Sequence, residues 1–231
     1  MKKEEERTIK YTKMFWLFII ASYFGLLLEG LYCLFKFGKW ESHVVSIYGH
    51  LCIIYGIGAV LYYIFNYIFK KQNFFLRFFI YACLGTFVEL VAGLILEFGL
   101  GMYAWSYRNS FLNFRGHICL FMFIVWGLFG LFFEKCDPYV DKLLKFTRKK
   151  VCKIITPILS IILAIDFAFT GVCIYRWSER HYYELPSNAL EKYIDKKYDD
   201  EYMSKRFMEW HFFDDSSLKS NNDKEKNKDV G

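Results

Sequence analysis

The sequence lacks the short motifs that mark the common enzyme classes. It has no Gly-rich phosphate loop ending in Lys-Ser or Lys-Thr, so we expect no nucleotide hydrolysis by the chain itself. It also has no H-E-x-x-H, C-x-x-C or G-x-S-x-G pattern, so it lacks the usual signatures of metalloproteases, zinc fingers, redox proteins and serine hydrolases. We therefore predict no enzyme activity, no catalytic residue, no cofactor and no metal.

Charged residues are almost absent from five long apolar runs, which lie at 14–36, 47–69, 76–98, 116–134 and 154–176. The chain has 231 residues and is 55% hydrophobic and 22% aromatic, which is too apolar for a soluble domain of this size. Each run approaches the roughly 20 residues that an α-helix needs to cross the hydrocarbon core. No alternating barrel pattern is visible, so we predict an all-α, polytopic transmembrane bundle of about five spans.

A cleavable signal peptide and a disulfide framework are also missing. The first run is longer than a usual signal segment, carries Glu29 and lacks a small-residue cleavage site, so we expect it to stay attached. Most of the seven cysteines lie inside apolar runs, where a free thiol behaves as a small hydrophobe: Cys33, Cys52, Cys83, Cys119 and Cys173.

Basic residues report orientation instead of a nucleic-acid partner. The net charge is +6, with five Lys or Arg in 1–13, three in 70–77 and seven in 135–153, against two each in 36–46 and 99–116. The positive-inside rule then places the N-terminus in the cytoplasm, and five spans place the C-terminal tail outside. We predict a multi-pass protein of the cell membrane. A re-entrant or interfacial fifth segment, indicated by Pro157 and Asp166, would return the tail to the cytoplasm.

The chain divides by composition. We predict a cytoplasmic lead-in (1–13), a four-helix transmembrane core (14–135), a basic cytoplasmic loop (136–153), a fifth transmembrane helix (154–176), an amphipathic tail (177–215) and a disordered end (216–231). The basic loop fits a short amphipathic stretch on anionic headgroups, or a coupling helix that docks on an ATPase. In the tail, Asn188 and Glu191 have the form of a helix-capping box, and we expect the helix to lie on a membrane or partner surface.

Acids and glycines alternate along the third run. Gly85, Glu89, Gly93 and Glu97 recur every four residues and so share one face of a helix. A charged residue at the centre of a membrane helix costs roughly 2.5 to 3.5 kcal/mol on insertion scales, so Glu89 should face protein or water. This stripe is the first candidate for a polar transmembrane site.

The first two runs repeat this pattern. Gly25-x-x-x-Glu29 echoes Gly85-x-x-x-Glu89, and Gly49-His50-Leu51-Cys52 echoes Gly116-His117-Ile118-Cys119. We interpret the echo as a duplicated two-helix hairpin. It predicts that Glu29 with His50 and Glu89 with His117 form two equivalent polar clusters facing one another in the outer half of the bundle. The alternative is a set of isolated hydrogen-bonded pairs that fix the helix register.

The predicted outer loop between the third and fourth runs mixes aromatic, polar and glycine residues. We predict that Trp105, Tyr107, Asn113, Arg115 and Gly116 form an ordered cap over the helix ends. Arg115 is the cation nearest to Glu97 and is expected to neutralise it. The alternative is a solvated loop with aromatic anchors.

Small residues mark the places where helices are expected to approach closely. The predicted packing positions are the glycines Gly25, Gly49, Gly56, Gly85, Gly93 and Gly127, together with Trp126. The second run also carries hydroxyls that need partners when buried, and these serve either helix packing or a polar lining shared with Glu29: Tyr55, Tyr62, Tyr63 and Tyr67.

Together these residues resemble the ABC-transporter type IV, or permease-like, family of bacterial multi-pass membrane proteins. The resemblance covers about residues 15–140. It adds to the motifs above the Tyr48-Gly49 to Tyr55-Gly56 segment, Trp105-x-Tyr107, Asn113-x-x-Gly116-x-Ile118 and Trp126-Gly127. The chain departs from the family pattern at Ser106, where an acid is usual, and at His50 and Ile53, where prolines are usual. The resemblance implies a permease-like component that works with a separate cytoplasmic ATPase or as a homodimer.

Three functions therefore stay open at this point. The first is a transport permease-like component of unknown substrate. The second is a structural or regulatory protein of the cell envelope in which Glu29 and Glu89 lock helices together. The third is an intramembrane metal or proton site, or an enzyme, built from the acids with His50 and His117.

Overall fold

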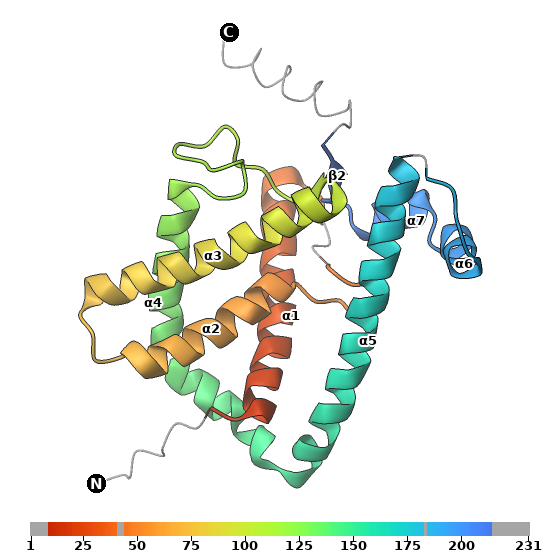
Figure 1. Cartoon of the computed structure of the whole chain (residues 1–231). Helices are drawn as coiled ribbons and strands as arrows, with labels where there is room; N and C mark the ends of the chain where they lie inside the picture. Colours follow the sequence, from red (N-terminus) through yellow and green to blue (C-terminus); the bar gives the residue numbers. More distant parts are fainter. Residues whose placement is uncertain (1–8, 41–43, 183, 214–231) are drawn as a thin grey trace.

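The computed structural model describes residues 9–40, 44–182 and 184–213 (Figure 1). The helices are α1 (Tyr11–Phe37), α2 (Ile53–Phe69), α3 (Phe74–Leu100), α4 (Leu120–Leu143), the 3-10 helix η1 (Leu144–Arg148), α5 (Lys150–His181), α6 (Ala189–Lys197) and α7 (Asp200–Arg206). Two short strands, β1 (Met102–Tyr103) and β2 (His211–Phe212), pair antiparallel. The predicted all-α fold is confirmed. Residues 1–8 of the predicted lead-in and the predicted disordered end, 216–231, lie outside the described residues.

Three helices in the described part of the chain are long and apolar enough to cross a membrane, and they correspond to α1, α3 and α5. α2 is apolar but has 17 residues, and the apolar part of α4 ends before Glu134. The helices thus have the composition of a membrane protein, and the count of five spans stays a prediction.

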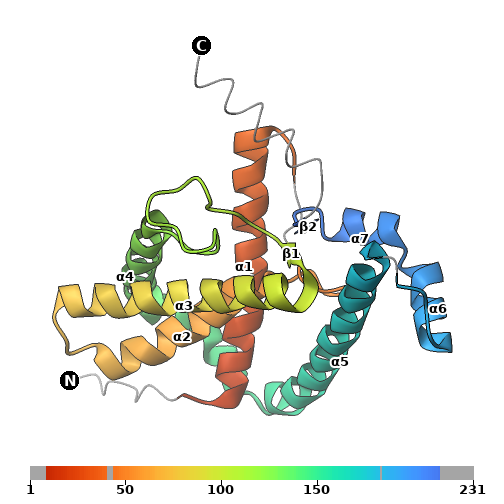
Figure 2. The ribbon, with the colours of Figure 1, turned by 45° about the horizontal axis from the view of Figure 1, so that its top comes forward.

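The helices of the two predicted hairpins cross one another steeply. In both views α2 and α3 lie side by side and run across α1 and α4, while α1 lies between α4 and α5 (Figures 1 and 2). Buried Tyr62, Tyr81 and Trp126 join α2, α3 and α4 in one apolar cluster. The Tyr62 hydroxyl also donates to the Trp126 carbonyl at 3.1 Å, so the two hairpins pack as a single body.

The second helix begins halfway along the first. The Cys52 amide donates to the Ser22 carbonyl at 3.2 Å, which places the start of α2 beside the middle of α1. The predicted run 47–69 therefore starts late, at Ile53, because residues 44–52 form no helix and are bonded to α5. A short loop between the first two runs would lay α2 along α1 from its outer end; instead, the outer half of α1 extends past α2.

The predicted basic loop is largely helical. α4 continues through Pro138 to Leu143, and η1 follows directly. Leu144 is buried in the core, and the Phe146 ring packs edge-on against Trp16 with ring centroids 5.4 Å apart. The apolar side chains at these two positions thus face the protein, whereas Leu143 is exposed, and the contact of this stretch with headgroups stays a prediction. α5 begins at Lys150, so Pro157 lies inside the helix and not in its first turn.

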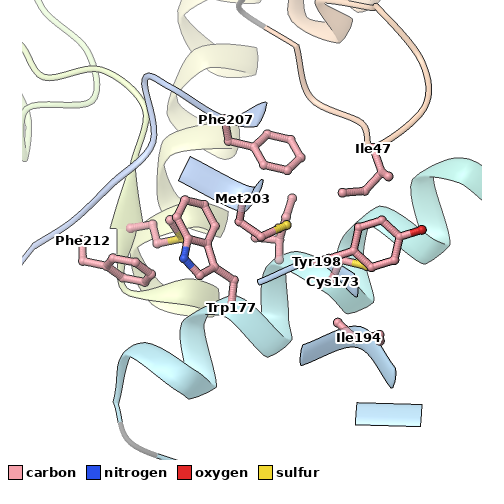
Figure 3. Packing of buried hydrophobic residues seen from close by; sticks show 10 residues of the cluster. Ile47, Cys173, Trp177, Ile194, Tyr198, Met203, Phe207 and Phe212 are labelled. Carbon is pink, nitrogen blue, oxygen red and sulfur yellow. The ribbon is translucent and has the colours of Figure 1, made fainter. Parts of the chain in front are cut away.

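The tail is two short helices folded onto the rest of the chain, not one amphipathic helix. Asn188 caps α6 by accepting from the Glu191 amide at 2.9 Å, as predicted, but the chain breaks at Tyr198 and Asp199 caps α7. The buried side chains of the tail meet those of α5 (Figure 3). Their cluster contains Ile47, Met102, Cys173, Ile174, Trp177, Ile194, Tyr198, Met203, Phe207 and Phe212. The expected membrane or partner surface is therefore covered by the chain itself at Ile194, Tyr198 and Phe207.

Candidate functional site

Residues of two helices surround Glu29. Gly25 and Glu29 lie one turn apart on α1, and Tyr55 of α2 crosses α1 at the glycine. A Cβ at position 25 would lie 2.5 Å from the Tyr55 Cβ, so only glycine lets the tyrosine approach the helix backbone this closely. The Tyr55 hydroxyl donates to Glu29 Oε1 at 2.5 Å.

The second acid has the same construction. A Cβ at Gly85 of α3 would lie 2.5 Å from the Trp126 Cγ of α4. The Trp126 indole N–H donates to Glu89 Oε2 at 3.0 Å. In each hairpin, then, an aromatic residue of the second helix lies on the glycine and donates to the glutamate one turn further along.

The residues around each aromatic side chain extend the match. Gly56 follows Tyr55 and packs on Phe18, while Gly127 follows Trp126 and packs on Phe78; the hypothetical Cβ atoms would lie 2.7 and 2.8 Å from the respective Phe Cδ2 atoms. The structural repeat therefore pairs Tyr55-Gly56 with Trp126-Gly127. This register differs by about one helical turn from the pairing of the Gly-His motifs that the sequence indicated.

The two acids belong to one connected cluster. The rings of Tyr55 and Trp126 meet edge-on, with centroids 6.4 Å apart. Tyr107 reaches down from the loop after α3, and its hydroxyl donates to Glu89 Oε1 at 2.7 Å. Burial raises the pKa of Tyr107 well above its usual range, and the charges of Glu89 and Glu29 both raise it further. The Tyr107 hydroxyl is therefore close enough to both Glu89 and Glu29 for their charges to act on it.

Glu89 is buried without a cation beside it. The residue is 4% exposed, and its two oxygens accept from Trp126 and Tyr107, which are neutral donors. Among the described residues, no Lys, Arg or His lies within ion-pair distance of this carboxylate. A buried carboxylate is costly unless its oxygens are hydrogen-bonded, so the two donors are what this position requires.

Glu97, two turns further along α3, has charged partners. Arg115 donates through Nε to Glu97 Oε2 at 3.0 Å and through Nη2 to Oε1. His117 Nε2 lies 2.6 Å from the same Oε2 and is 2% exposed. The His117 ring lies against Gly93, where an added Cβ would be 2.6 Å from its Cγ. The expected contact between Arg115 and Glu97 is present.

The loop after α3 is held by its own hydrogen bonds. The Trp105 indole donates to the His117 carbonyl at 2.9 Å, and the Tyr107 amide donates to the Gly116 carbonyl at 2.7 Å. Gly116 has φ +79°, a conformation that favours glycine. Asn113 donates to two carbonyls within the loop, each at 3.0 Å, and so stabilises the loop instead of touching a helix.

The predicted Glu–His pairs are wrong in their partners. His117 bonds Glu97 and not Glu89, because Trp126 and Tyr107 occupy both oxygens of Glu89. His50 is exposed, and its Nε2 lies 3.3 Å from Arg206 of α7. Gly49 packs on Ser46 and Asp166 instead of on a neighbouring helix of the hairpin. Glu29 and Glu89 are instead linked through the edge-on contact of Tyr55 with Trp126.

An acidic face on α4 is not among the sites that the sequence predicts. Glu134, Asp137 and Asp141 point toward three other helices: Glu134 pairs with Arg77 of α3 at 3.4 Å, Asp137 accepts from Asn66 of α2, and Asp141 pairs with Lys13 of α1 at 2.7 Å. The helical spacing of these acids is the signal that could have found them. This spacing does not indicate a shared face when residues 136–153 are interpreted as a loop instead of a helix.

No group of three or more His, Cys, Asp or Glu residues in the described part of the chain is arranged to hold a metal ion. The candidate site is instead a cluster of acids and aromatic donors.

The fold and the site define a helical membrane protein with buried acids at its centre. A family described as "Putative ABC-transporter type IV" matches residues 16–171, and the chain belongs to this family. The match extends beyond the expected 15–140 and includes α5 as far as Gly171. No curated protein and no solved structure matches the chain.

Proposed function

We propose that the protein is a permease-like component of a transport assembly in the cell membrane, and that its polar site is the cluster of Glu29, Tyr55, Glu89, Tyr107 and Trp126. The observation that carries this proposal is the burial of Glu89 with neutral donors alone. Such a carboxylate can take up a proton or meet a cationic group without first losing an ion pair. Glu97 differs, because it would have to release Arg115.

The cluster is also placed where it can respond to the outer side. Tyr107 connects the loop of residues 101–119 to Glu89. His117, in the same loop, accepts from Trp105 through its carbonyl and contacts Glu97 through its ring. A movement of this loop would change the hydrogen bonding of the buried acid. We propose that the loop and the acid act together, with the substrate unassigned.

The ends of the helices support the proposed orientation. Trp16 of α1 donates to Thr156 of α5 at 3.0 Å, so the two helices begin at the same end of the molecule. At the other end, Ser178 of α5 donates to the Leu100 carbonyl of α3 at 2.7 Å. A cytoplasmic N-terminus would then place the end of α5 and the tail outside, as the distribution of basic residues predicts.

A separate ATPase is part of this proposal. The chain has no phosphate-binding loop, so energy from ATP has to come through another polypeptide if the family description applies to its activity. The small size also favours a homodimer or a partner subunit. The chain itself is proposed to be non-enzymatic.

A second candidate function is supported by the close packing. Glu29 and Glu89 accept hydrogen bonds from aromatic residues of this same chain, and each acid lies one turn from a glycine on which an aromatic side chain rests. The same contacts can lock four helices together in a structural or regulatory membrane protein. In that case Glu89 has no role beyond stability.

The two candidates are separated by purification and one conservative substitution. Tagged protein is extracted from its native membranes and assayed for co-purifying ATP hydrolysis and for thermal stability. Under the transport proposal an ATPase co-purifies, and Glu89→Gln lowers its activity about tenfold or more while stability changes little, since Gln can still bond both neighbours.

The matched control for this experiment is Glu201→Gln. It removes an exposed acid of α7 from its pair with Lys205, outside the cluster and the loop after α3. We expect it to leave the ATPase activity near that of the parent protein. If no ATPase co-purifies after chemical cross-linking, or if Glu89→Gln leaves the activity of a co-purifying ATPase near that of the parent protein, the transport proposal fails and the locking function is supported.

A further inference from the structure

The segment that leads into α2 is held from outside its own hairpin. Residues 44–52 form no regular secondary structure, yet Val44 and Ser46 are fully buried. A buried segment outside helices and strands has to satisfy its backbone N–H and C=O groups with other partners. Here most of the partners come from α5 and α7, which lie outside the duplicated four helices.

α5 supplies the acceptors. Asp166 Oδ2 accepts from the Ser46 hydroxyl at 2.7 Å and from the Gly49 amide at 3.0 Å, while Oδ1 accepts from the Tyr48 amide at 3.3 Å. The Thr170 hydroxyl oxygen accepts from the Ile47 amide at 2.9 Å. Three consecutive backbone N–H groups are thus bound by two side chains one turn apart on α5.

α7 supplies the donor for the carbonyl side of the same segment. Arg206 donates through Nε and Nη2 to the Ser46 carbonyl at 2.9 and 2.7 Å, and through Nη2 to the Gly49 carbonyl at 2.6 Å. Tyr198, between α6 and α7, places its hydroxyl 2.6 Å from that of Tyr48. The segment therefore lies between an acid of α5 and an arginine of the tail.

The tail is fixed in this place by its own contacts with α5. Arg176 is 2% exposed and bonds both oxygens of Asp195 at 2.9 and 3.0 Å. Arg180 also bonds Asp195, at 2.7 Å. With the buried cluster of Figure 3, these ion pairs hold α7 at the position from which Arg206 reaches Ser46.

The second hairpin has supports of its own near the start of α4, although the tail also contacts the other end of its loop, where β1 pairs with β2. The part of the loop that leads into α4 is held by Trp105, by Tyr107 and by the pair of Arg115 and Glu97. The two hairpins therefore share the Gly-x-x-x-Glu unit but differ in what positions the start of their second helix.

We propose that α5 and the C-terminal tail form a clamp that positions the first hairpin, with Asp166 and Arg206 as the positioning residues. The clamp fixes the start of α2, and with it the position of Tyr55 against Glu29. Loss of the Arg206 contacts frees residues 44–52, while Trp105 and Arg115 still hold the segment before α4. This inference rests on the described contacts and does not depend on the proposed transport function.

Two native cysteines report separately on the starts of α2 and α4. Cys52 precedes α2 and Cys119 precedes α4, and they are 7% and 3% exposed. In a background that keeps one of them and replaces the other six cysteines, the rate of thiol labelling measures how often the start of that helix opens. The full chain is used in detergent under native conditions.

Arg206→Gln is expected to speed labelling of Cys52 about tenfold or more and of Cys119 less than about twofold, because charged hydrogen bonds are lost only at the start of α2. Lys205→Gln is the matched control, since Lys205 is exposed and pairs with Glu201 on its own helix. It should change neither rate. Unequal labelling supports the clamp.

Equal acceleration at both cysteines, or no acceleration at Cys52, would overturn the proposal. The first result would mean that Arg206 serves general stability, and the second that the start of α2 holds without it. If Arg206→Gln does not fold, Asp166→Asn decides in its place, because it weakens the clamp from the side of α5. The same pattern, fast at Cys52 and unchanged at Cys119, is then required.

Discussion

Replacing Gly85 by alanine tests the central contact of the second hairpin. The new methyl group would lie 2.5 Å from the Trp126 Cγ and 2.7 Å from its Cβ, which no real Cβ tolerates. These atoms belong to the stem of the side chain and cannot swing away as a flexible end would. α3 and α4 must therefore separate, or the Trp126 ring must leave Glu89.

The size of the effect follows from two opposing terms. Alanine is favoured over glycine inside a helix by roughly 0.5 to 1 kcal/mol, so a harmless site should gain stability. Overpacking a close contact typically costs about 1 to 3 kcal/mol, and a loosened indole would also weaken its hydrogen bond to Glu89. We expect a net loss of about 1 to 3 kcal/mol for Gly85→Ala.

Thermal unfolding of the purified protein in one detergent measures the difference. The matched control is Gly171→Ala on α5, where an added Cβ meets nothing within 4 Å, and it should be neutral or stabilising. The double variant Gly85→Ala with Trp126→Ala should lose less than the sum of the single losses, since the second change removes most of the obstacle. Equal stability of the variants at Gly85 and Gly171, or strict additivity of the pair, would refute this packing argument.

Three further outcomes are expected. Glu97→Gln and Arg115→Ala should each lower stability, and their double variant should lose less than the sum in a thermal double-mutant cycle; full additivity would disprove the pairing. An impermeant thiol reagent should label both Ser110→Cys and Leu190→Cys in intact cells. If the Ser110 variant is labelled only after permeabilisation, the whole topology is wrong. If only the Leu190 variant needs permeabilisation, the fifth span alone is wrong. Burial acts to raise the pKa of Asp195, but the arginines of α5 lower it below its ordinary 3.8 overall. The ion pairs of Asp195 therefore stabilise the tail fully above pH 3.8, and this stabilisation is lost as the pH falls through the lowered pKa. Proteolysis of the tail should be faster at pH 3 than at pH 6.

The sequence was sufficient for the features that depend on short range along a helix. The four-residue spacing of Gly25 with Glu29 and of Gly85 with Glu89 places each pair on one face, and both acids are found beside an aromatic donor. The opposite charges of Arg115 and Glu97 at one end of α3 were also enough to predict their contact. The substrate has no comparable signal.

The partners of the acids could not be predicted, because they depend on the register between helices. Equal spacing within each Gly-His-x-Cys motif suggested that His50 and His117 occupy matching places. Packing decides otherwise, since Tyr55 and Trp126 rest on the glycines and fix the register about one turn away from that pairing. The hydroxyl of Tyr55 made it a candidate for a polar lining with Glu29, whereas nothing in the sequence marked Trp126 as the partner of Glu89.

The tail differs from its prediction for a related reason. A helical pattern of apolar residues such as Ile194 and Phe207 shows that one face must be covered, but not by what. The cover comes from Cys173, Ile174 and Trp177 of α5, which a hydropathy profile counts as part of a span. Arg176, buried among them, was the available sign that this end of α5 faces protein.

The difference between the hairpins can be traced to two positions of the duplicated helix. α3 continues the stripe after Glu89 with Gly93 and Glu97, while the matching positions of α1 hold Cys33 and Phe37. Without a glycine and an acid there, the first hairpin has no place for a loop histidine and arginine such as His117 and Arg115 occupy. Its connecting segment must therefore find charged partners elsewhere. The family match covers the acid half of the clamp on α5 and ends at residue 171, before the arginine half on α7, so the tail contributes its support from outside the family region.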